Sequence, residues 1–101
     1  KSVREGDTVA RYGGEEFILI LPGAGIEASS MIAERIRQLV ESTPFDVRKA
    51  QLNLSVSLGI SSFPVHRASS DGELIKMADQ ALYEAKRGGR NRVCVFSSNQ
   101  R

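Results

Sequence analysis

A pair of glycines, Gly13-Gly14, placed between two apolar segments constrains the fold of this 101-residue chain more than any other feature. Residues 8–12 (TVARY) and 17–21 (FILIL) are rich in β-branched and aromatic side chains, which are typical of strands. Two such segments joined by Gly-Gly predict a β-hairpin with a two-residue turn, because the turns that suit hairpins need positive φ at their central positions. We therefore expect antiparallel pairing between residues 8–12 and 17–21.

Two adjacent carboxylates, Glu15 and Glu16, follow the glycines and directly precede the second strand. Anionic oxygens beside backbone N–H groups suit Mg²⁺ and a bound nucleotide. A hairpin whose acidic side chains are merely solvated is the plain alternative, and a pentapeptide alone does not decide between the two. The segment is therefore a candidate metal and nucleotide site.

Hydrophobic periodicity predicts a first helix over residues 26–42, which Pro44 ends. Its expected core residues are Ile32, Ile36, Leu39 and Val40. We expect Arg37 and the polar side chains around it to lie largely outside the core.

Strand-like segments follow at residues 45–47 and 51–60, and a last one spans residues 92–96. The apolar residues that alternate with polar residues or glycine in the second of these are Leu52, Leu54, Val56, Leu58 and Ile60. A period of two predicts one face in the core and one that is polar or close to a partner. The loop at residues 61–69 holds the only histidine, His66, which we expect to be a solvated surface group.

Residues 70–73 (SDGE) match a capping box, which predicts the start of a second helix. The residues that this helix is expected to bury are Leu74, Ala78, Ala81, Leu82 and Ala85. We expect it to end at Gly88-Gly89, where a glycine takes the left-handed cap.

The order of these elements predicts an α+β fold, with helices packed on a largely antiparallel sheet in a ferredoxin-like arrangement. A chain of 101 residues is one domain at most. The second strand of the hairpin is apolar on both faces and needs a neighbour that covers or pairs it. We therefore expect residues 1–101 to form a partial domain, with at least one strand and one helix missing upstream.

Composition narrows the class of protein. A net charge of +2, six aromatic residues in the form of four Phe and two Tyr, and no Trp argue against binding to a nucleic-acid polymer. Four cations without an intervening acid, Lys86, Arg87, Arg90 and Arg92, form either a basic helix end or a phosphate site. The single cysteine, Cys94, excludes an intrachain disulfide and fits a reducing cytosol. The sequence shows no secretory signal or membrane span, so we expect a cytoplasmic location. This expectation holds for these residues even if they belong to a longer protein that is anchored in a membrane.

Residues 13–17 (GGEEF) resemble the signature of the GGDEF family, the diguanylate cyclases, in its Glu-for-Asp form. Residues 4–7 (REGD) precede it at the offset of that family's Arg-x-x-Asp inhibitory site, and Arg11-Tyr12 leads into the glycines as in the family. Later segments resemble family blocks in the same order, namely AERIR at 33–37, SVSLGI at 55–60, ADQALY at 78–83 and AKRGGRN at 85–91. The resemblance covers essentially the whole chain.

The resemblance implies a nucleotide-cyclase palm domain that condenses two GTP molecules into cyclic di-GMP and releases two pyrophosphates. Charge that builds on the phosphoryl oxygens in such a reaction is neutralised by metal, here Mg²⁺ or Mn²⁺. Glu15 would be a metal ligand and a candidate base for the ribose 3′-hydroxyl, and Glu16 a further catalytic carboxylate or ligand. Each domain binds one GTP, so catalysis would need a homodimer, imposed by an upstream sensory or receiver domain.

The resemblance also assigns residues to the substrate. Gly13 and Gly14 would leave room for the nucleotide to approach the backbone, where a Cβ would collide. Lys86 and Arg90, at the end of the second helix, would hold the terminal phosphates through charge-assisted hydrogen bonds. The plain alternative for these two cations is a basic helix terminus.

A product site is implied by three further residues. Arg4 and Asp7 resemble the family's inhibitory pair, in which the arginine meets phosphate or guanine edges and the aspartate accepts from guanine. Arg35 resembles a second position that contacts this ligand. A surface ion pair for the first two, and a solvated helix arginine for the third, are the plain alternatives.

The family's first strand carries another metal-binding aspartate, and the helices after it carry residues that recognise guanine; neither is among these 101 residues. The resemblance therefore implies that the fragment alone is inactive although its parent is active. Two alternatives stay open: a noncatalytic receptor that binds cyclic di-GMP at Arg4 and Asp7, and a GTP-binding regulator of a neighbouring phosphodiesterase domain. The intact carboxylates at residues 15 and 16 argue against the receptor.

Overall fold

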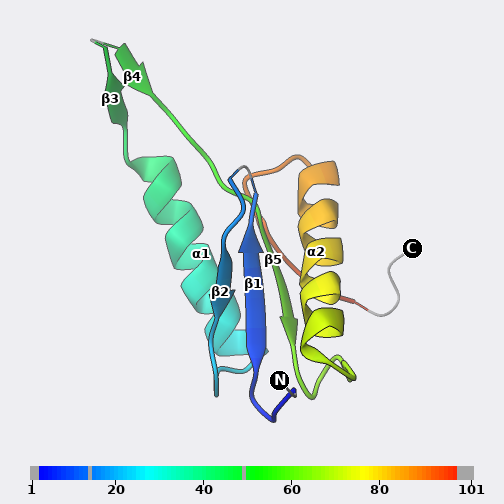
Figure 1. The fold of residues 1–101 in the computed structure, drawn as a ribbon. Coiled ribbons are helices and arrows are strands. Elements are labelled where there is room, and N and C mark those ends of the chain that lie inside the picture. The colour runs from blue at the N-terminus through cyan, green and yellow to red at the C-terminus, as the bar shows by residue number, and fades with distance from the viewer. Residues whose placement is uncertain (1–2, 14, 49, 98–101) are drawn as a thin grey trace.

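A central sheet lies between two helices in the computed structural model, which describes residues 3–13, 15–48 and 50–97 (Figure 1). In chain order the elements are β1 (Thr8–Tyr12), β2 (Ile18–Ile20), α1 (Ile26–Ser42), β3 (Phe45–Val47), β4 (Ala50–Leu52), β5 (Leu58–Ser62), α2 (Asp71–Arg87) and β6 (Val93–Val95). None of the helices in the described part of the chain is long and apolar enough to span a membrane.

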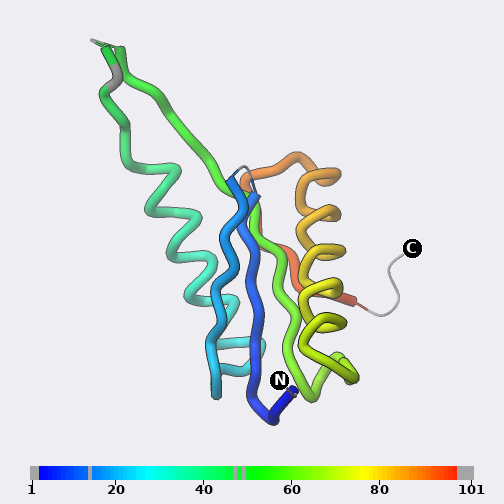
Figure 2. Tube along the Cα trace, in the orientation of Figure 1, coloured from blue at the N-terminus to red at the C-terminus, as the bar shows by residue number. Residues whose placement is uncertain are grey.

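The main sheet has the strand order β2-β1-β5-β6. Strand β1 pairs antiparallel with both β2 and β5, and β5 pairs parallel with β6. Strands β3 and β4 form a separate hairpin that stands away from this body, beyond the end of α1 (Figure 2). The expected α+β fold with a largely antiparallel sheet is therefore confirmed.

Strand β5 is the centre of the core, because each of its residues is buried. Leu58 and Ile60 pack with Ala10 of β1 and with Ala33 of α1. On the α2 side, the hydroxyl of Ser61 donates a hydrogen bond of 2.5 Å to the carbonyl of Leu74. Helices thus cover both faces of this strand.

The structure confirms the predicted start and buried face of helix α2. Its buried residues are Leu74, Ala78, Ala81, Leu82 and Ala85, as expected. At its start, the N–H of Glu73 donates to the hydroxyl of Ser70 at 3.1 Å. The Glu73 carboxylate reaches back one residue further than a capping box requires, and accepts from the N–H and hydroxyl of Ser69. These two hydrogen bonds lower the pKa of Glu73.

The end of α2 shows which glycine is left-handed. Gly88 has a φ of −76°, and the positive φ, +123°, is found at Gly89. The N–H of Arg90 donates to the carbonyl of Ala85 at 2.9 Å, and the N–H of Gly89 donates to that of Lys86 at 3.4 Å. This pair of bonds is the Schellman pattern, so the loop that leaves the helix has a defined direction.

The expected single strand over residues 51–60 is wrong. Its first part, β4, pairs with β3 in the projecting hairpin, whereas its last part belongs to β5 of the main sheet. Leu52 and Leu54 are 45% and 46% exposed, since the projecting segment lies away from the main core. Alternation in the sequence does not reveal that the chain leaves one sheet and enters another.

Helix α1 has the expected bounds but a different buried face. The small residues Ser29 and Ala33 are buried, whereas Leu39, expected in the core, is 65% exposed. Small side chains let the helix approach the sheet closely, so the contact follows their stripe. The side chain of Arg37, expected outside, is only 16% exposed.

His66 is a structural residue, and the expectation of a solvated surface group is wrong. The N–H of Ser62 donates to Nδ1 of His66 at 2.9 Å, and the imidazole packs edge-on against Phe96 with ring centroids 5.2 Å apart. Burial lowers the pKa of His66 below its ordinary value, an effect that a backbone hydrogen bond with Phe96 partly opposes.

Gly59 is the position at which α2 meets β5. A Cβ on Gly59 would lie 2.2 Å from the backbone nitrogen of Leu82 and 2.3 Å from the carbonyl oxygen of Ala78. Neither group can yield, because both belong to the helix backbone. The helix therefore lies directly on the strand, and only glycine fits between them.

We predict that Gly59→Ala destabilises the chain by about 3 kcal/mol or more, because overpacking here must displace α2 as a whole. Gly72→Ala, in the exposed first turn of α2, is the matched control and should stabilise by about 0.5 kcal/mol. Urea unfolding measures both. Equal effects of the two substitutions would contradict this packing.

We also predict that stability falls as the pH is lowered through about 6.5, the ordinary pKa of histidine. The unfolded chain takes up a proton there, whereas His66 in the fold takes it up only at lower pH. The contribution is complete above that pH and is lost below it. His66→Asn keeps an acceptor for the N–H of Ser62 and removes the titration, so its unfolding free energy should vary less between pH 7.5 and 5. An unchanged slope would contradict the prediction.

Candidate nucleotide site

The hairpin loop is longer than the sequence indicates. The N–H of Tyr12 donates to the carbonyl of Phe17 at 3.1 Å, and the two rings meet edge-on with centroids 6.0 Å apart. This pairing leaves residues 13–16 as the loop, so the expected two-residue turn is wrong. Gly13 does not adopt a positive φ, and Gly14 lies outside the described residues.

The structure brings Lys86 to Gly13. A Cβ on Gly13 would lie 3.2 Å from Cε of Lys86 and 3.4 Å from Cβ of Ser57. The N–H of Gly13 also donates to the carbonyl of Ser57 at 2.7 Å. The absence of a side chain at Gly13 thus makes room for the stem of Lys86, for which the family resemblance implies a phosphate-binding role.

Ser57 joins the hairpin to the loop after α2. Its side chain is buried, and its hydroxyl accepts from the N–H of Asn91 at 3.0 Å while its carbonyl serves Gly13. Arg90 and Asn91 both have a left-handed backbone, with φ of +66° and +50°. Ser57 therefore links Gly13 of the hairpin to Asn91, the residue that follows Arg90. The sequence predicts no role for this buried serine.

The two carboxylates of the hairpin have different surroundings. Glu16 is ion-paired to Arg11, whose guanidinium also pairs with Asp79 of α2. Both Glu15 and Glu16 are exposed, but within the described residues Glu15 forms no ion pair. Arg11 thus neutralises one carboxylate and leaves the other open to solvent. Its role was missed, although an arginine inside a strand of small and apolar residues is a usable signal.

The cations assigned to phosphate are also open. Among the described residues, neither Lys86 nor Arg90 forms an ion pair with a carboxylate. Arg90 is exposed, and Lys86 is half-buried beside Gly13. Within the described part of the chain, the site therefore offers two cations and one carboxylate that form no ion pair.

The donor set suits a hard divalent cation. The described residues contain no cluster of three or more His, Cys, Asp or Glu side chains that could hold a metal by themselves. Mg²⁺ commonly binds through one or two carboxylates, with substrate phosphates and water as the remaining ligands. Glu15 and Glu16 could supply the carboxylates of such a shared site, in which a nucleotide would provide further ligands.

Arg4 and Asp7 lie at the opposite end of β1. The N–H of Arg4 donates to Oδ2 of Asp7 at 2.9 Å and the N–H of Asp7 to the carbonyl of Arg4 at 3.0 Å, so a turn joins them and not a side-chain ion pair. Both line a pocket of about 220 Å³ between the hairpin and the start of α2. Its other walls are Val9, Ile20, Pro22, Asp71, Leu74 and Ile75. The pocket combines apolar walls with one guanidinium and two carboxylates.

Arg35 does not join this pocket. It lies with Met31, Glu34 and Gln38 along an open depression on α1, and α1 is on the other side of the sheet from α2 (Figure 1). The structure therefore separates the three residues predicted for one inhibitory ligand into two surfaces.

The family model described as "Diguanylate cyclase, GGDEF domain" matches residues 1–92. This chain belongs to the GGDEF family. The Diguanylate cyclase A of Treponema denticola is 42% identical over 96 residues, which cover 95% of this chain and 26% of that protein. This GGDEF chain thus spans about a quarter of the length of a curated relative.

Solved GGDEF domains share the fold. The active GGEEF domain of a diguanylate cyclase from Vibrio cholerae superposes with a TM-score of 0.75 at 37% identity, covering 86% of this chain and 54% of that one. The GGDEF domain of DgcB from Caulobacter crescentus, solved in complex with c-di-GMP, gives a TM-score of 0.73 at 37% identity over 82% of this chain and 48% of that one. The recognition of the family from sequence is confirmed.

Proposed function

We propose that this GGDEF chain is part of a diguanylate cyclase that condenses two GTP molecules into cyclic di-GMP and releases two pyrophosphates. The observation that carries the proposal is the approach of Lys86 to Gly13, because it brings a cation from the end of α2 to the hairpin that bears the two carboxylates. Family membership and the cyclase relatives support the same activity.

In this proposal each part of the site has one task. Lys86 and Arg90 hold the terminal phosphates of GTP through charge-assisted hydrogen bonds. Gly13 leaves space for the stem of Lys86, and Gly14 lets the nucleotide approach the loop. Mg²⁺ or Mn²⁺, when bound, neutralises charge on the phosphoryl oxygens. Glu15, which pairs with no cation among the described residues, would be the chief protein ligand of the metal or would take the proton of the ribose 3′-hydroxyl.

Glu16 has a different task in this proposal. Its ion pair with Arg11 lowers its value as a metal ligand and fixes the second carboxylate of the hairpin beside α2. We therefore assign Glu16 an auxiliary role, as a further ligand or as a support of the loop.

A larger assembly is part of the proposal. One domain binds one GTP, so ring closure needs two domains with facing sites, in a homodimer imposed by an upstream sensory or receiver domain. Ile18 and Ile20 of the edge strand β2 are 48% and 52% exposed and share one face of the sheet, so a further element packed on that face would cover them. The half-buried Cys94, whose thiol pKa is raised by burial, fits a cytoplasmic location in which thiols stay reduced.

The pocket at Arg4 and Asp7 supports an inhibitory product site. Apolar walls suit the faces of a guanine base, the carboxylates suit its N–H groups, and the guanidinium suits a phosphate or a base edge. Since Arg35 lies on the other side of the sheet, a ligand that contacts all three would bridge two domains. Cyclic di-GMP would then hold them in a nonproductive arrangement.

The same pocket favours a second candidate function, a noncatalytic receptor of cyclic di-GMP. A receptor would have no use for the carboxylate of Glu15 or for the cations at residues 86 and 90, which form no ion pair in the part of the chain that the structure describes. We therefore rank it below the cyclase.

We predict that the longer parent protein forms cyclic di-GMP from GTP with Mg²⁺, and that Glu15→Gln lowers the rate by at least about 100-fold because metal stabilisation is lost. Glu16→Gln should cost less, and Glu27→Gln, an acid in the exposed first turn of α1, is the control. The isolated chain of residues 1–101 should form no product. Chromatographic assay of cyclic di-GMP decides; product from the isolated chain, or full activity of Glu15→Gln, would contradict the proposal.

We predict that Arg4→Ala and Asp7→Ala weaken binding of cyclic di-GMP to the parent by about tenfold or more, because each removes a charged partner. Glu5→Ala, an exposed acid between them, should leave binding unchanged. Titration calorimetry measures all three. Product binding by a parent that makes no product would move the function to the receptor, whereas unchanged binding in Arg4→Ala would remove this pocket from both functions.

A further inference from the structure

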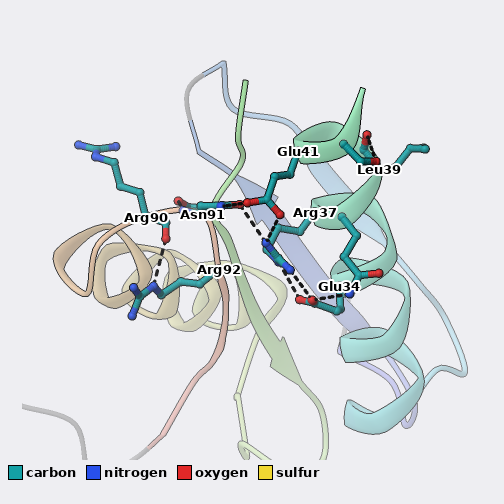
Figure 3. A network of polar contacts seen from close by, with 10 residues as sticks. Glu34, Arg37, Leu39, Glu41, Arg90, Asn91 and Arg92 are labelled. Carbon is teal, nitrogen blue, oxygen red and sulfur yellow. Dashed lines mark hydrogen bonds and ion pairs between the residues drawn. The ribbon is translucent and has the colours of Figure 1, made fainter. Parts of the chain in front are cut away.

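A closed network of hydrogen bonds ties helix α1 to the loop that follows α2 (Figure 3). The guanidinium of Arg37 donates from Nε and Nη2 to the two carboxylate oxygens of Glu34, at 2.9 and 2.6 Å. Its Nη1 donates to Oε1 of Glu41 at 3.2 Å and to Oδ1 of Asn91 at 3.1 Å. The side-chain amide of Asn91 donates in turn to Oε2 of Glu41 at 2.7 Å.

Asn91 is therefore held from two directions. Its side chain is fixed to α1 by the network, and its backbone N–H is fixed to the buried hydroxyl of Ser57. Its left-handed φ of +50° is a conformation that asparagine tolerates better than most residues do. The residue that precedes it is Arg90, also left-handed, so the direction of the Arg90 side chain depends on how Asn91 is held.

The strength of the network is modest, but its geometry is specific. Glu34 and Glu41 are 43% and 53% exposed, and exposed ion pairs add little stability. The side chain of Arg37 is only 16% exposed, and its planar guanidinium donates to acceptors on three residues at once, which a lysine ammonium does not reproduce. The same contact lowers the pKa of Glu34. A network of this kind fixes position more than it adds stability.

We infer that Arg37, Glu41 and Asn91 are positioning residues for the phosphate-binding segment at residues 86–90, acting through Asn91 on the terminal phosphates of the nucleotide. This inference rests on the proposed binding of GTP at that segment. None of the three needs to touch the nucleotide. They hold the loop in the one conformation in which Lys86, beside Gly13, and Arg90 face a common ligand.

The test compares a triphosphate with a monophosphate on the full-length parent protein. The probes are 3′-deoxy-GTP and 3′-deoxy-GMP with Mg²⁺, which cannot condense, and their Kd values come from calorimetry. Loss of the network should weaken binding of the triphosphate and leave binding of the monophosphate unchanged. The preference ratio is the Kd of the monophosphate divided by the Kd of the triphosphate. In Arg37→Gln and Asn91→Ala this ratio should fall about tenfold, as expected when a charge-assisted phosphate contact is misaligned. Partial unfolding lowers the active fraction for both probes and leaves the ratio unchanged.

Matched variants separate the network from general damage. Gln38→Ala removes a different hydrogen bond to Glu34 on the same helix and should keep the wild-type ratio. Arg37→Lys keeps the charge but should still lower the preference for the triphosphate. Asn91→Asp should lower this preference through repulsion between residue 91 and Glu41. Adding Glu41→Gln to Asn91→Asp exchanges donor and acceptor and should restore the preference.

The outcomes distinguish the two proposals. A wild-type ratio kept in Arg37→Gln and Asn91→Ala would overturn the positioning role alone. A wild-type parent that binds both probes equally would overturn both the positioning role and the phosphate site. A parent that prefers the triphosphate yet forms no cyclic di-GMP would overturn the cyclase only, and the ratio in the variants would still support or overturn the positioning role.

Discussion

The contact between α2 and the backbone of β5 at Gly59 is the constraint on which the rest of the structure depends. Because no Cβ stands there, the helix lies against the strand, and Ser61 can bond the helix carbonyl at Leu74. The axis of α2 is then set by the sheet, and its last turn reaches the hairpin, where Lys86 meets Gly13. The placement of the proposed phosphate site thus follows from packing, before any charge is considered.

Charge is arranged on this frame so that some groups of the proposed site are ion-paired and others are not. Arg11 pairs with Glu16 and with Asp79, and so removes two carboxylates from the field of the site. Within the described residues, the remaining hairpin carboxylate at Glu15 and the nearby cation Lys86 are not ion-paired. Ordered groups that need no rearrangement on binding are the general basis of electrostatic preorganisation. A metal and a triphosphate would supply the opposite charges.

Local patterns predicted local structure well, and contacts between distant segments poorly. The buried face of α2 follows from its spacing, because one wide apolar stripe of Leu and Ala meets one sheet face. The face of α1 does not follow, because Ser29 and Ala33, and not the larger Leu39, make the contact. The signature motif predicted the position of the hairpin but not the length of its loop. The pairing of Tyr12 with Phe17 across the two strands sets that length. The sequence does not predict the contacts of Ser57, since they arise only where the hairpin and the loop after α2 meet the strand.

The most direct test of the central claim, that hairpin and phosphate segment form one GTP site, is a double-mutant cycle on the parent protein. Binding of 3′-deoxy-GTP with Mg²⁺ would be measured for wild type, Glu15→Gln, Lys86→Met and the double variant. If metal, triphosphate and cation share one site, the two losses should be non-additive by about 1 kcal/mol or more. Losses that add within about 0.3 kcal/mol would show two independent regions and would contradict the account.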